Sequence, residues 1–443
     1  MRKFSKYLFL LLAVVSFSAC DDYLDVKPKD RVIPTTGEDF RDLLSSAYHA
    51  IPDDKAKLTF RTDEVKLNES RYDLSNVKDI YMWNDANPAD NTITYTYDIF
   101  YKVIMYANHV IAEGDGATEA TQEEIDQILG EAYLLRAYIH FNLVNMFGKP
   151  YQKASAATDR GIPLSLEIDS EAEYIPNTVA EVYEQIQSDI TDGLSKLKVD
   201  TYATGLNYRF SKVAALAFQS RVYLYMAEYA KAQESALEAL KLKSDLQDLV
   251  ADNSKAPHMY DAVESILAMD DNVNDDLRSA TYISEEMKAA FDQTNDLRFA
   301  LYFEADGEEF AINKGVELAS KCTFRTAELY LIVAECKARL DELDDAKDYL
   351  NQLKAKRLTA DFYTTEETRI NALNKADLIA EIAKERFREL AFEGHRWFDL
   401  RRTTQKEIVH TYKGETATLI KNDPRYTLRF PQEAIDNNPN LRD

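Results

Sequence analysis

The sequence predicts a mainly α-helical protein that combines tetratricopeptide-like helix pairs with an irregular, loop-rich face. Glycine and proline number only 12 and 11 among 443 residues, well below their usual shares of about 7% and 5%. A chain so poor in turn formers is unlike an all-β sandwich, and a hydrophobic content of 45% is ample for a sizeable core. From about Asp39 onward, apolar residues recur at three- and four-residue spacing, which is the helical period.

The first residues predict export and a lipid anchor. Basic residues at positions 2, 3 and 6 precede an apolar run over 7–15, and the small pair Ser18-Ala19 precedes Cys20. This is the three-part layout of a signal peptide, and its apolar run is shorter than the roughly 20 residues that span a bilayer. A cysteine directly after the cut resembles the lipobox of bacterial lipoproteins, so we expect lipid attachment at Cys20. The alternative is an ordinary signal peptide that ends near a cysteine.

The mature chain is then expected to begin with an acidic leader over 20–37, followed by a single helical domain over 38–443. Thr178 and Glu181 have the spacing of a capping box at a helix start, and Gly394 is expected to end a helix in the left-handed conformation. The predicted helices are 38–51, 93–113, 121–147, 178–197, 211–227, 229–243, 284–292, 324–340, 342–357 and 375–393.

Two of these helices carry the spacing of a tetratricopeptide repeat. Ser220, Tyr223, Ala232 and Ala239 match its small–aromatic–Ala–Ala pattern. A second pair, 324–340 with 342–357, fits more loosely. Longer polar stretches over 52–92, 148–177, 250–283 and 303–320 separate the helices, and loops of that length often serve binding.

Charge and motif content exclude several classes of function. The formal net charge of −24 repels nucleic acid and anionic lipid headgroups, so we expect neither as a partner. The sequence contains no protease zinc motif, nucleophile elbow, phosphate loop or dinucleotide fingerprint. His140 lies in an apolar helix and is expected to be a core histidine. We therefore predict no enzyme, no metal site and no cofactor.

Two features that resemble metal or disulfide sites have simpler interpretations. The acidic run over 270–276 lacks the Gly and Glu that an EF-hand needs, so a solvated loop is favoured over a calcium site. Cys322 and Cys336 are 14 residues apart, too far for a disulfide if they share a helix. We expect both to be buried apolar fillers.

Aromatic residues next to amides and carboxylates indicate a sugar site. An aromatic ring covers the apolar face of a sugar, while Asn and Asp bond its hydroxyls. Trp83 is one of only two tryptophans, and its turn-like surroundings suggest an exposed ring. The alternative is that Trp83 packs on the helices. The predicted ligand-binding residues are Trp83, Tyr81, Asn84, Asp85, Tyr72, Asp63 and Tyr282.

Several segments together resemble the SusD/RagB family of outer-membrane nutrient-binding lipoproteins. The similarity runs through the whole chain in order and is most specific at 385–402. The matching segments are 131–138 (EAYLLRAY), 147–150 (FGKP), 178–189 (TVAEVYEQIQSD), 295–298 (NDLR), 325–335 (RTAELYLIVAE), 385–402 (ERFRELAFEGHRWFDLRR) and 430–441 (FPQEAIDNNPNL). We interpret 385–402 as ion-paired helix ends with Trp397 as a core plug, because its acids and arginines alternate.

The resemblance implies a cell-surface lipoprotein of the outer membrane that binds an oligosaccharide or polysaccharide. It also implies delivery of that ligand to a SusC-like TonB-dependent transporter, without catalysis. A peptide-binding RagB-like protein is the nearest alternative, since the fold does not determine the ligand. A lipid-anchored repeat scaffold that binds only proteins is another. An exported glycosidase would need two carboxyls about 5–10 Å apart across a cleft.

Overall fold

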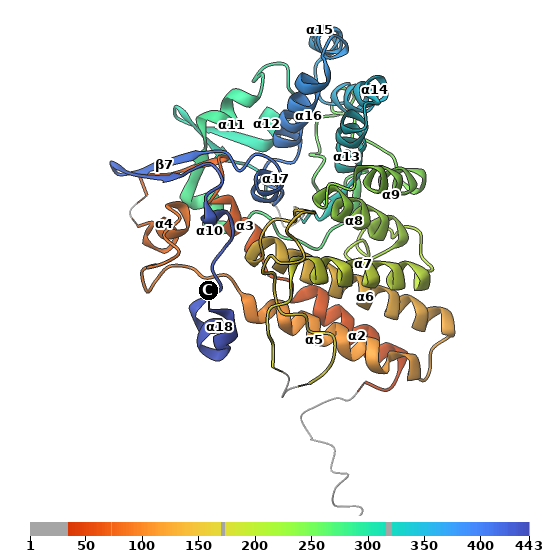
Figure 1. The fold of residues 1–443 in the computed structure, drawn as a ribbon. Helices are drawn as coiled ribbons and strands as arrows, with labels where there is room; N and C mark the ends of the chain where they lie inside the picture. Colours follow the sequence, from red (N-terminus) through yellow and green to blue (C-terminus); the bar gives the residue numbers. More distant parts are fainter. Residues whose placement is uncertain (1–33, 72, 170–172, 316–320, 443) are drawn as a thin grey trace, which may run out of the picture.

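The computed structural model describes residues 34–71, 73–169, 173–315 and 321–442. Within these ranges the chain is mainly helical (Figure 1), which confirms the predicted fold class. The α-helices are α2 (Gly37–His49), α3 (Asp54–Thr59), α4 (Ser75–Tyr81), α5 (Tyr97–Glu113), α6 (Gln122–Phe147), α7 (Val179–Lys196), α8 (Lys212–Tyr225), α9 (Tyr229–Leu242), α10 (Asp275–Ala280), α11 (Glu285–Ala290), α12 (Phe299–Tyr302), α13 (Thr326–Arg339), α14 (Leu343–Lys354), α15 (Ala360–Asn371), α16 (Lys375–Glu389), α17 (Arg396–Arg402) and α18 (Gln432–Asn437). Three short 3₁₀ helices are η1 (Gly114–Gly116), η2 (Pro424–Tyr426) and η3 (Pro439–Leu441).

Consecutive helices pack as pairs along one side of the molecule (Figure 1). In the pair α8–α9, the small residues Ser220, Ala232 and Ala239 are all fully buried, so the two helices approach closely, as the repeat spacing predicts. In the pair α13–α14, Ala334 and Ala346 are equally buried. Helix α13 also contacts α9, so the two pairs stack into one array.

The described strands form four small antiparallel sheets, two of which join distant parts of the chain. Strand β1 (Val65–Leu67) pairs with β3 (Thr281–Ile283), and β2 (Ser265–Leu267) pairs with β6 (Phe324–Arg325). Two hairpins are formed by β4 (Phe303–Asp306) with β5 (Glu309–Ile312), and by β7 (Ile408–Tyr412) with β8 (Glu415–Leu419). These contacts hold the loop-rich half against the helix pairs.

Buried apolar residues form three clusters. The largest lies among α2 and α5–α9 and extends to α17. A second cluster lies around β1, α4 and α10–α12, and a third lies between α13, α14 and α16. Trp397 belongs to the first cluster and is only 1% exposed, which confirms its predicted role as a core plug.

The charged residues around 385–402 form a buried ion-pair network, as predicted. Glu389 accepts hydrogen bonds from three guanidinium groups, those of Arg298, Arg325 and Arg357, at 2.5–2.8 Å. Arg325 also binds Glu393, at 2.8 Å. The side chains of Glu389 and its three arginines are at most 1% exposed, so this network lies in the interior and offers nothing to a ligand.

All ten predicted helices are present, but the prediction missed the 12-residue α15 and six helices of four to seven residues: α3, α4, α10, α12, α17 and α18. The ends of the predicted helices also shift. Helix α5 begins at Tyr97 rather than 93, and α16 ends at Glu389 rather than 393. Gly394 does have a positive φ of 73°, but it follows a turn instead of capping the helix.

Three smaller predictions have mixed outcomes. The capping box at Thr178 is confirmed, and His140 is fully buried. Cys322 and Cys336 are buried free thiols, as expected. The acidic run over 270–276 is only partly a solvated loop, because Asp270 is buried and pairs with Lys55 at 2.9 Å.

Among the residues that the structure describes, no helix has both the length and the hydropathy needed to cross a membrane.

Candidate ligand-binding site

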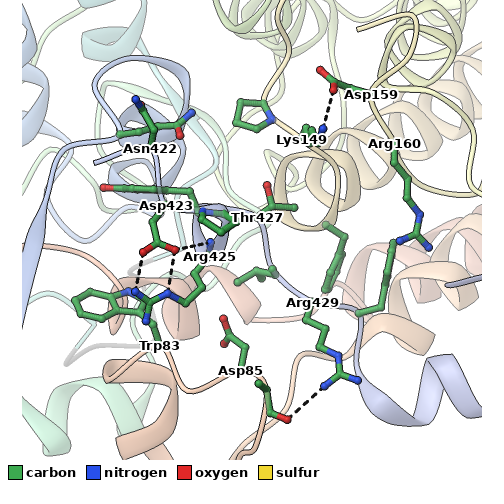
Figure 2. A pocket seen from close by; sticks show the side chains of 18 of the residues that line it. Trp83, Asp85, Lys149, Asp159, Arg160, Asn422, Asp423, Arg425, Thr427 and Arg429 are labelled. Atoms are coloured by element: carbon green, nitrogen blue, oxygen red, sulfur yellow. Dashed lines mark hydrogen bonds and ion pairs between the residues drawn. The ribbon is translucent and has the colours of Figure 1, made fainter. Parts of the chain in front are cut away.

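Three distant segments of the chain meet around a cavity of about 770 Å³ (Figure 2), which we call the charged cavity. One wall follows α4, a second follows α6, and a third precedes α18. Its lining residues are Trp83, Asn84, Asp85, Ala86, Phe147, Lys149, Pro150, Gln152, Asp159, Arg160, Gln405, Asn422, Asp423, Pro424, Arg425, Tyr426, Thr427, Leu428, Arg429 and Phe430.

Trp83 begins the first wall in a strained backbone conformation, with a φ of 53°. Its N–H bonds the carbonyl of Ile80, and the N–H of Asn84 bonds the carbonyl of Asp79. This pattern is a Schellman motif, in which glycine usually takes the left-handed position. A bulky residue there is an outlier, and it turns the chain directly into the cavity wall.

Backbone strain recurs across the cavity. Gln405 and Asn422, which also line it, have φ values of 38° and 58°, and their main chains are hydrogen bonded to each other at 2.9 Å. Such conformations cost roughly 1–3 kcal/mol each and concentrate at functional sites. Three of the eight described non-glycine residues with positive φ line this cavity, and the other five lie elsewhere.

Each carboxylate that lines the cavity is held by a basic side chain. Arg61, buried behind the wall, binds Asp85 through two hydrogen bonds of 2.6 and 2.8 Å. Arg425 binds Asp423 in the same bidentate way, and Lys149 binds Asp159 at 2.9 Å (Figure 2).

The partners keep two of these carboxylates ionised. The hydrogen bond from Arg425 lowers the pKa of Asp423 below its usual range. Burial alone would raise the pKa of Asp159, but the hydrogen bonds from Ser155 and Lys149 outweigh it and lower that pKa. A general acid in glycoside hydrolysis needs a raised pKa, so neither carboxylate is suited to that role.

Among the basic side chains that line the charged cavity, Arg429 is the one that neighbouring residues bind most weakly. Its guanidinium donates to the carbonyl of Ala86 at 3.4 Å and to the amide oxygen of Gln432 at 3.1 Å. No ion pair to a carboxylate involves it within the described part of the chain. It therefore keeps hydrogen-bonding capacity for a ligand.

A second cavity of about 560 Å³, the tyrosine cavity, lies between α5, residues 163–169 with Tyr174, and α18. Its wall carries four tyrosines that are partly buried, together with amides and carboxylates. Its lining residues are Thr94, Tyr95, Thr96, Tyr97, Asp98, Tyr101, Met105, Pro163, Ser165, Glu167, Ile168, Asp169, Tyr174, Pro431, Gln432, Glu433, Ala434, Asn437, Asn438 and Leu441.

The expectation that Trp83 is exposed is wrong. Its side chain is 2% exposed, because its ring stacks on His410 at 4.2 Å and its indole N–H donates to the carbonyl of Arg61. Tyr81 covers the other face of His410 at 3.9 Å and is equally buried. The packing interpretation is therefore the one that the structure shows.

The other predicted site residues are dispersed. Asn84 and Asp85 line the charged cavity beside Trp83. Asp63 is buried in ion pairs with Arg396 and Lys406, and the Tyr282 hydroxyl donates to Asp306 at 2.7 Å. Neither of these two residues lines either cavity. Tyr72, like the predicted lipid-attachment residue Cys20, lies outside the described residues. A ligand-binding role for all seven stays a prediction.

Sequence reasoning missed most of the cavity walls. Arg425 and Arg429 lie in a stretch without periodicity, and Lys149 lies in a motif that we assigned to the fold. Tyr97 and Tyr101 were counted as part of a helix. The available signal was the concentration of tyrosines over 95–101, directly after the segment chosen for its aromatic content.

Nowhere in the ranges that the structure describes do three or more His, Cys, Asp or Glu side chains gather closely enough to hold a metal ion.

Known families and structures match nearly the whole chain. Residues 22–224 match a family described as "Starch-binding associating with outer membrane", and residues 263–442 match the SusD family. A SusD-like protein of Formosa agariphila is 24% identical, over 95% of this chain and 96% of its own length.

Solved structures share the fold. A SusD superfamily protein from Bacteroides thetaiotaomicron has a TM-score of 0.76 at 23% identity, covering 92% of this chain and 99% of its own. A laminarin-binding SusD-like protein has a TM-score of 0.62 at 19% identity, covering 83% and 92%. With two family matches that run from residue 22 to residue 442, this chain belongs to the SusD/RagB family.

Proposed function

We propose that this protein is a non-catalytic glycan-binding lipoprotein of the outer membrane, with the charged cavity as its main ligand site. In this proposal residues 1–19 are a signal peptide, Cys20 carries lipid ahead of an acidic leader, and 38–443 form one domain facing the cell exterior. A SusC-like TonB-dependent transporter receives the ligand.

The observation that carries the proposal is the chemistry of the charged cavity. Asp85 and Asp423 are held in place by arginines, Arg429 keeps hydrogen-bonding capacity, and Asn84 and Asn422 add amides. Ala86, Pro150 and Pro424 add accessible apolar surface beside them, whereas Phe147 and Phe430 are each only 4% exposed. Ligand sites combine apolar lining with a few placed polar groups, and sugars need both. The family description as starch-binding and the laminarin-binding structural neighbour support a glycan as the ligand.

The same ion pairs argue against hydrolysis. Asp85, Asp159 and Asp423 each hold a cation, whereas a glycosidase needs one neutral carboxylic acid beside one carboxylate. A cavity built this way binds a polar chain and leaves its bonds intact.

One observation favours a protein-binding scaffold as the second candidate. A groove of about 590 Å³ runs between α9, α13 and α14, with Tyr330 and Tyr349 in its wall. Grooves between helix pairs are a usual docking surface in repeat proteins. The buried Trp83 also agrees with this alternative. Peptide binding at the charged cavity is a third candidate function, and the experiment must distinguish it from glycan binding and from the scaffold.

The test is calorimetric titration of the soluble form, starting after Cys20, with laminarin, starch and mixed peptides. Arg425→Gln is the site variant. Arg369→Gln on α15 is its matched control, because both arginines bind a carboxylate bidentately and their side chains are 38% and 42% exposed.

We expect a glycan to bind the wild type without being cleaved and to bind Arg425→Gln about tenfold more weakly, a loss of about 1.4 kcal/mol. Arg369→Gln should bind like the wild type. Binding of peptides alone would favour the peptide alternative. No binding to either panel, together with capture of a protein at the α9–α13 groove, would favour the scaffold.

A further inference from the structure

The tyrosine cavity has no assigned role, and its chemistry differs from that of its neighbour. We propose that it is a second glycan subsite that holds neutral sugar units of the same chain that occupies the charged cavity. This inference rests on the proposed function, because it extends the ligand of that site.

The two cavities share one aromatic wall. Phe147 and Phe430 line the charged cavity and stack on each other at 5.2 Å. Tyr97 lines the tyrosine cavity and contacts both rings edge-on, at 5.5 and 5.6 Å. One cluster of three contacting rings therefore contributes to the walls of both cavities.

The rims of the two cavities also touch at the protein surface. Arg429 lines the charged cavity and Gln432 lines the tyrosine cavity. Both residues are exposed, and their side chains are hydrogen bonded at 3.1 Å. A chain leaving the charged cavity over Arg429 thus meets the tyrosine cavity directly, without crossing intervening structure.

The tyrosine rings are held in place before any ligand arrives. The Tyr101 hydroxyl donates to the carbonyl of Pro163 at 2.7 Å, and the Tyr174 hydroxyl donates to that of Asp169 at 3.3 Å. Tyr97 and Tyr101 lie 4.9 Å apart at a 45° tilt. Preordered rings reduce the entropy lost on binding, and an aromatic ring suits the apolar face of a sugar.

The charges around this cavity select neutral sugars. None of its described lining residues is Lys or Arg, whereas Asp98, Glu167 and Glu433 are exposed carboxylates at its edge. Such a rim repels carboxylated or sulfated sugars. The same carboxylates, with Asn437, accept hydrogen bonds from neutral hydroxyls.

The experiment is titration of the soluble form with fragments of β-1,3-glucan and of α-1,4-glucan, each graded from trisaccharide to heptasaccharide. The site variants are Asn437→Ala, whose side chain makes no hydrogen bond to another described residue, and Tyr101→Ala. Ala434→Trp is a third variant that fills the cavity without removing its wall. Tyr363→Ala on α15, at the opposite end of the molecule (Figure 1), is the control.

We expect wild-type affinity for one series to rise about tenfold or more with chain length, as for the gain of one well-packed sugar. The three site variants should bind the trisaccharide normally and lose that rise, while the control keeps it. Thermal unfolding identifies any variant that fails to fold. If Tyr101→Ala or Ala434→Trp fails, the titration of Asn437→Ala alone tests the subsite. Affinity independent of length, or a rise that survives in the variants, would overturn the subsite while leaving the proposed function intact. If the wild type binds no fragment, both proposals fall for these glycans.

Discussion

Two regions of the molecule are built from pairs of basic side chains and carboxylates, and they differ in how far these pairs are exposed. In the network around Glu389, the side chains of Glu389 and its three arginines are at most 1% exposed. In the charged cavity, the side chains of Arg425 and Lys149 are 38% and 61% exposed. The first region joins α16 to the loop-rich half of the chain, whereas the second borders an open space.

The difference shows that a density of charged pairs does not mark a binding site. Burying charges is costly unless each is paired and hydrogen bonded. Every charge in the buried network therefore needs its partner for the folded state to be stable. The cavity pairs retain contact with solvent and can exchange water for ligand hydroxyls. The most specific family segment, 385–402, therefore reports the fold rather than the ligand.

The largest expected effect comes from breaking the closed network. Glu389→Gln leaves three buried guanidinium groups without their shared carboxylate, so we expect unfolding free energy to fall by about 3–5 kcal/mol. Urea unfolding measures this. Asp200→Asn, which breaks an exposed pair with Lys212, should cost less than about 1 kcal/mol. Similar costs for the two variants would contradict the comparison.

The network should also fail in acid. Burial alone would raise the pKa of Glu393, but Arg325 and Lys314 outweigh it and lower the pKa to about 2. The stability from this group is present above the ordinary value of 4.5 and is lost as pH falls toward 2. We expect the unfolding free energy, measured in urea at each pH, to decline through this interval.

A smaller effect is expected at Glu64, a buried carboxyl without a cation. It accepts hydrogen bonds from the N–H of Phe392 and the hydroxyl of Thr62, and it has no ion pair within the described residues. Burial raises its pKa from 4.5 to about 7. The folded state thus retains a proton that the unfolded state releases, so Glu64 makes the protein less stable as pH rises from 4.5 to 7.

Replacing that carboxyl isolates its contribution. The stability of Glu64→Gln relative to the wild type should rise by about 2–3 kcal/mol between pH 4.5 and pH 8. Paired denaturation curves at the two pH values test this. A constant difference between the proteins would show that folding does not raise the pKa of Glu64.

The smallest effect on stability is expected at the open cavity. Lys149→Gln breaks an exposed pair and should change the unfolding free energy by less than about 1 kcal/mol. It should nevertheless weaken glycan binding about fivefold, or ~1 kcal/mol. Lys212→Gln, at a comparable exposed pair, should leave binding unchanged. An equal loss in both variants would place the ligand elsewhere.

The long helices were predictable because their periodicity extends over many residues. Helices α3, α4 and α17 have only six or seven residues, too few for a period to show, and they depend on tertiary contacts for stability. The pairing of Asp270 with Lys55, 215 positions away, has no local signal either. The sequence therefore predicts the helix pairs, whereas it does not predict the short helices and long-range contacts of the loop-rich half.

The predicted site residues overlap the candidate site only in part. Asn84 and Asp85 do line the charged cavity, but Trp83 is covered by His410 from a strand more than 300 residues later. The exposure of an aromatic ring depends on such distant partners. The arginines of the far wall come from a stretch near the other end of the chain, which sequence spacing cannot connect to residues 83–85.

Both cavities are complete only once the segment 422–441 has packed against residues from much earlier in the chain. Arg61 bonds the carbonyl of Arg425, 364 residues later, and the same late segment supplies walls of both cavities. The helix pairs have local contacts and are expected to form early, whereas contacts of this separation form slowly. A chain truncated before residue 422 is thus expected to keep its repeat scaffold and to lack a place for the ligand.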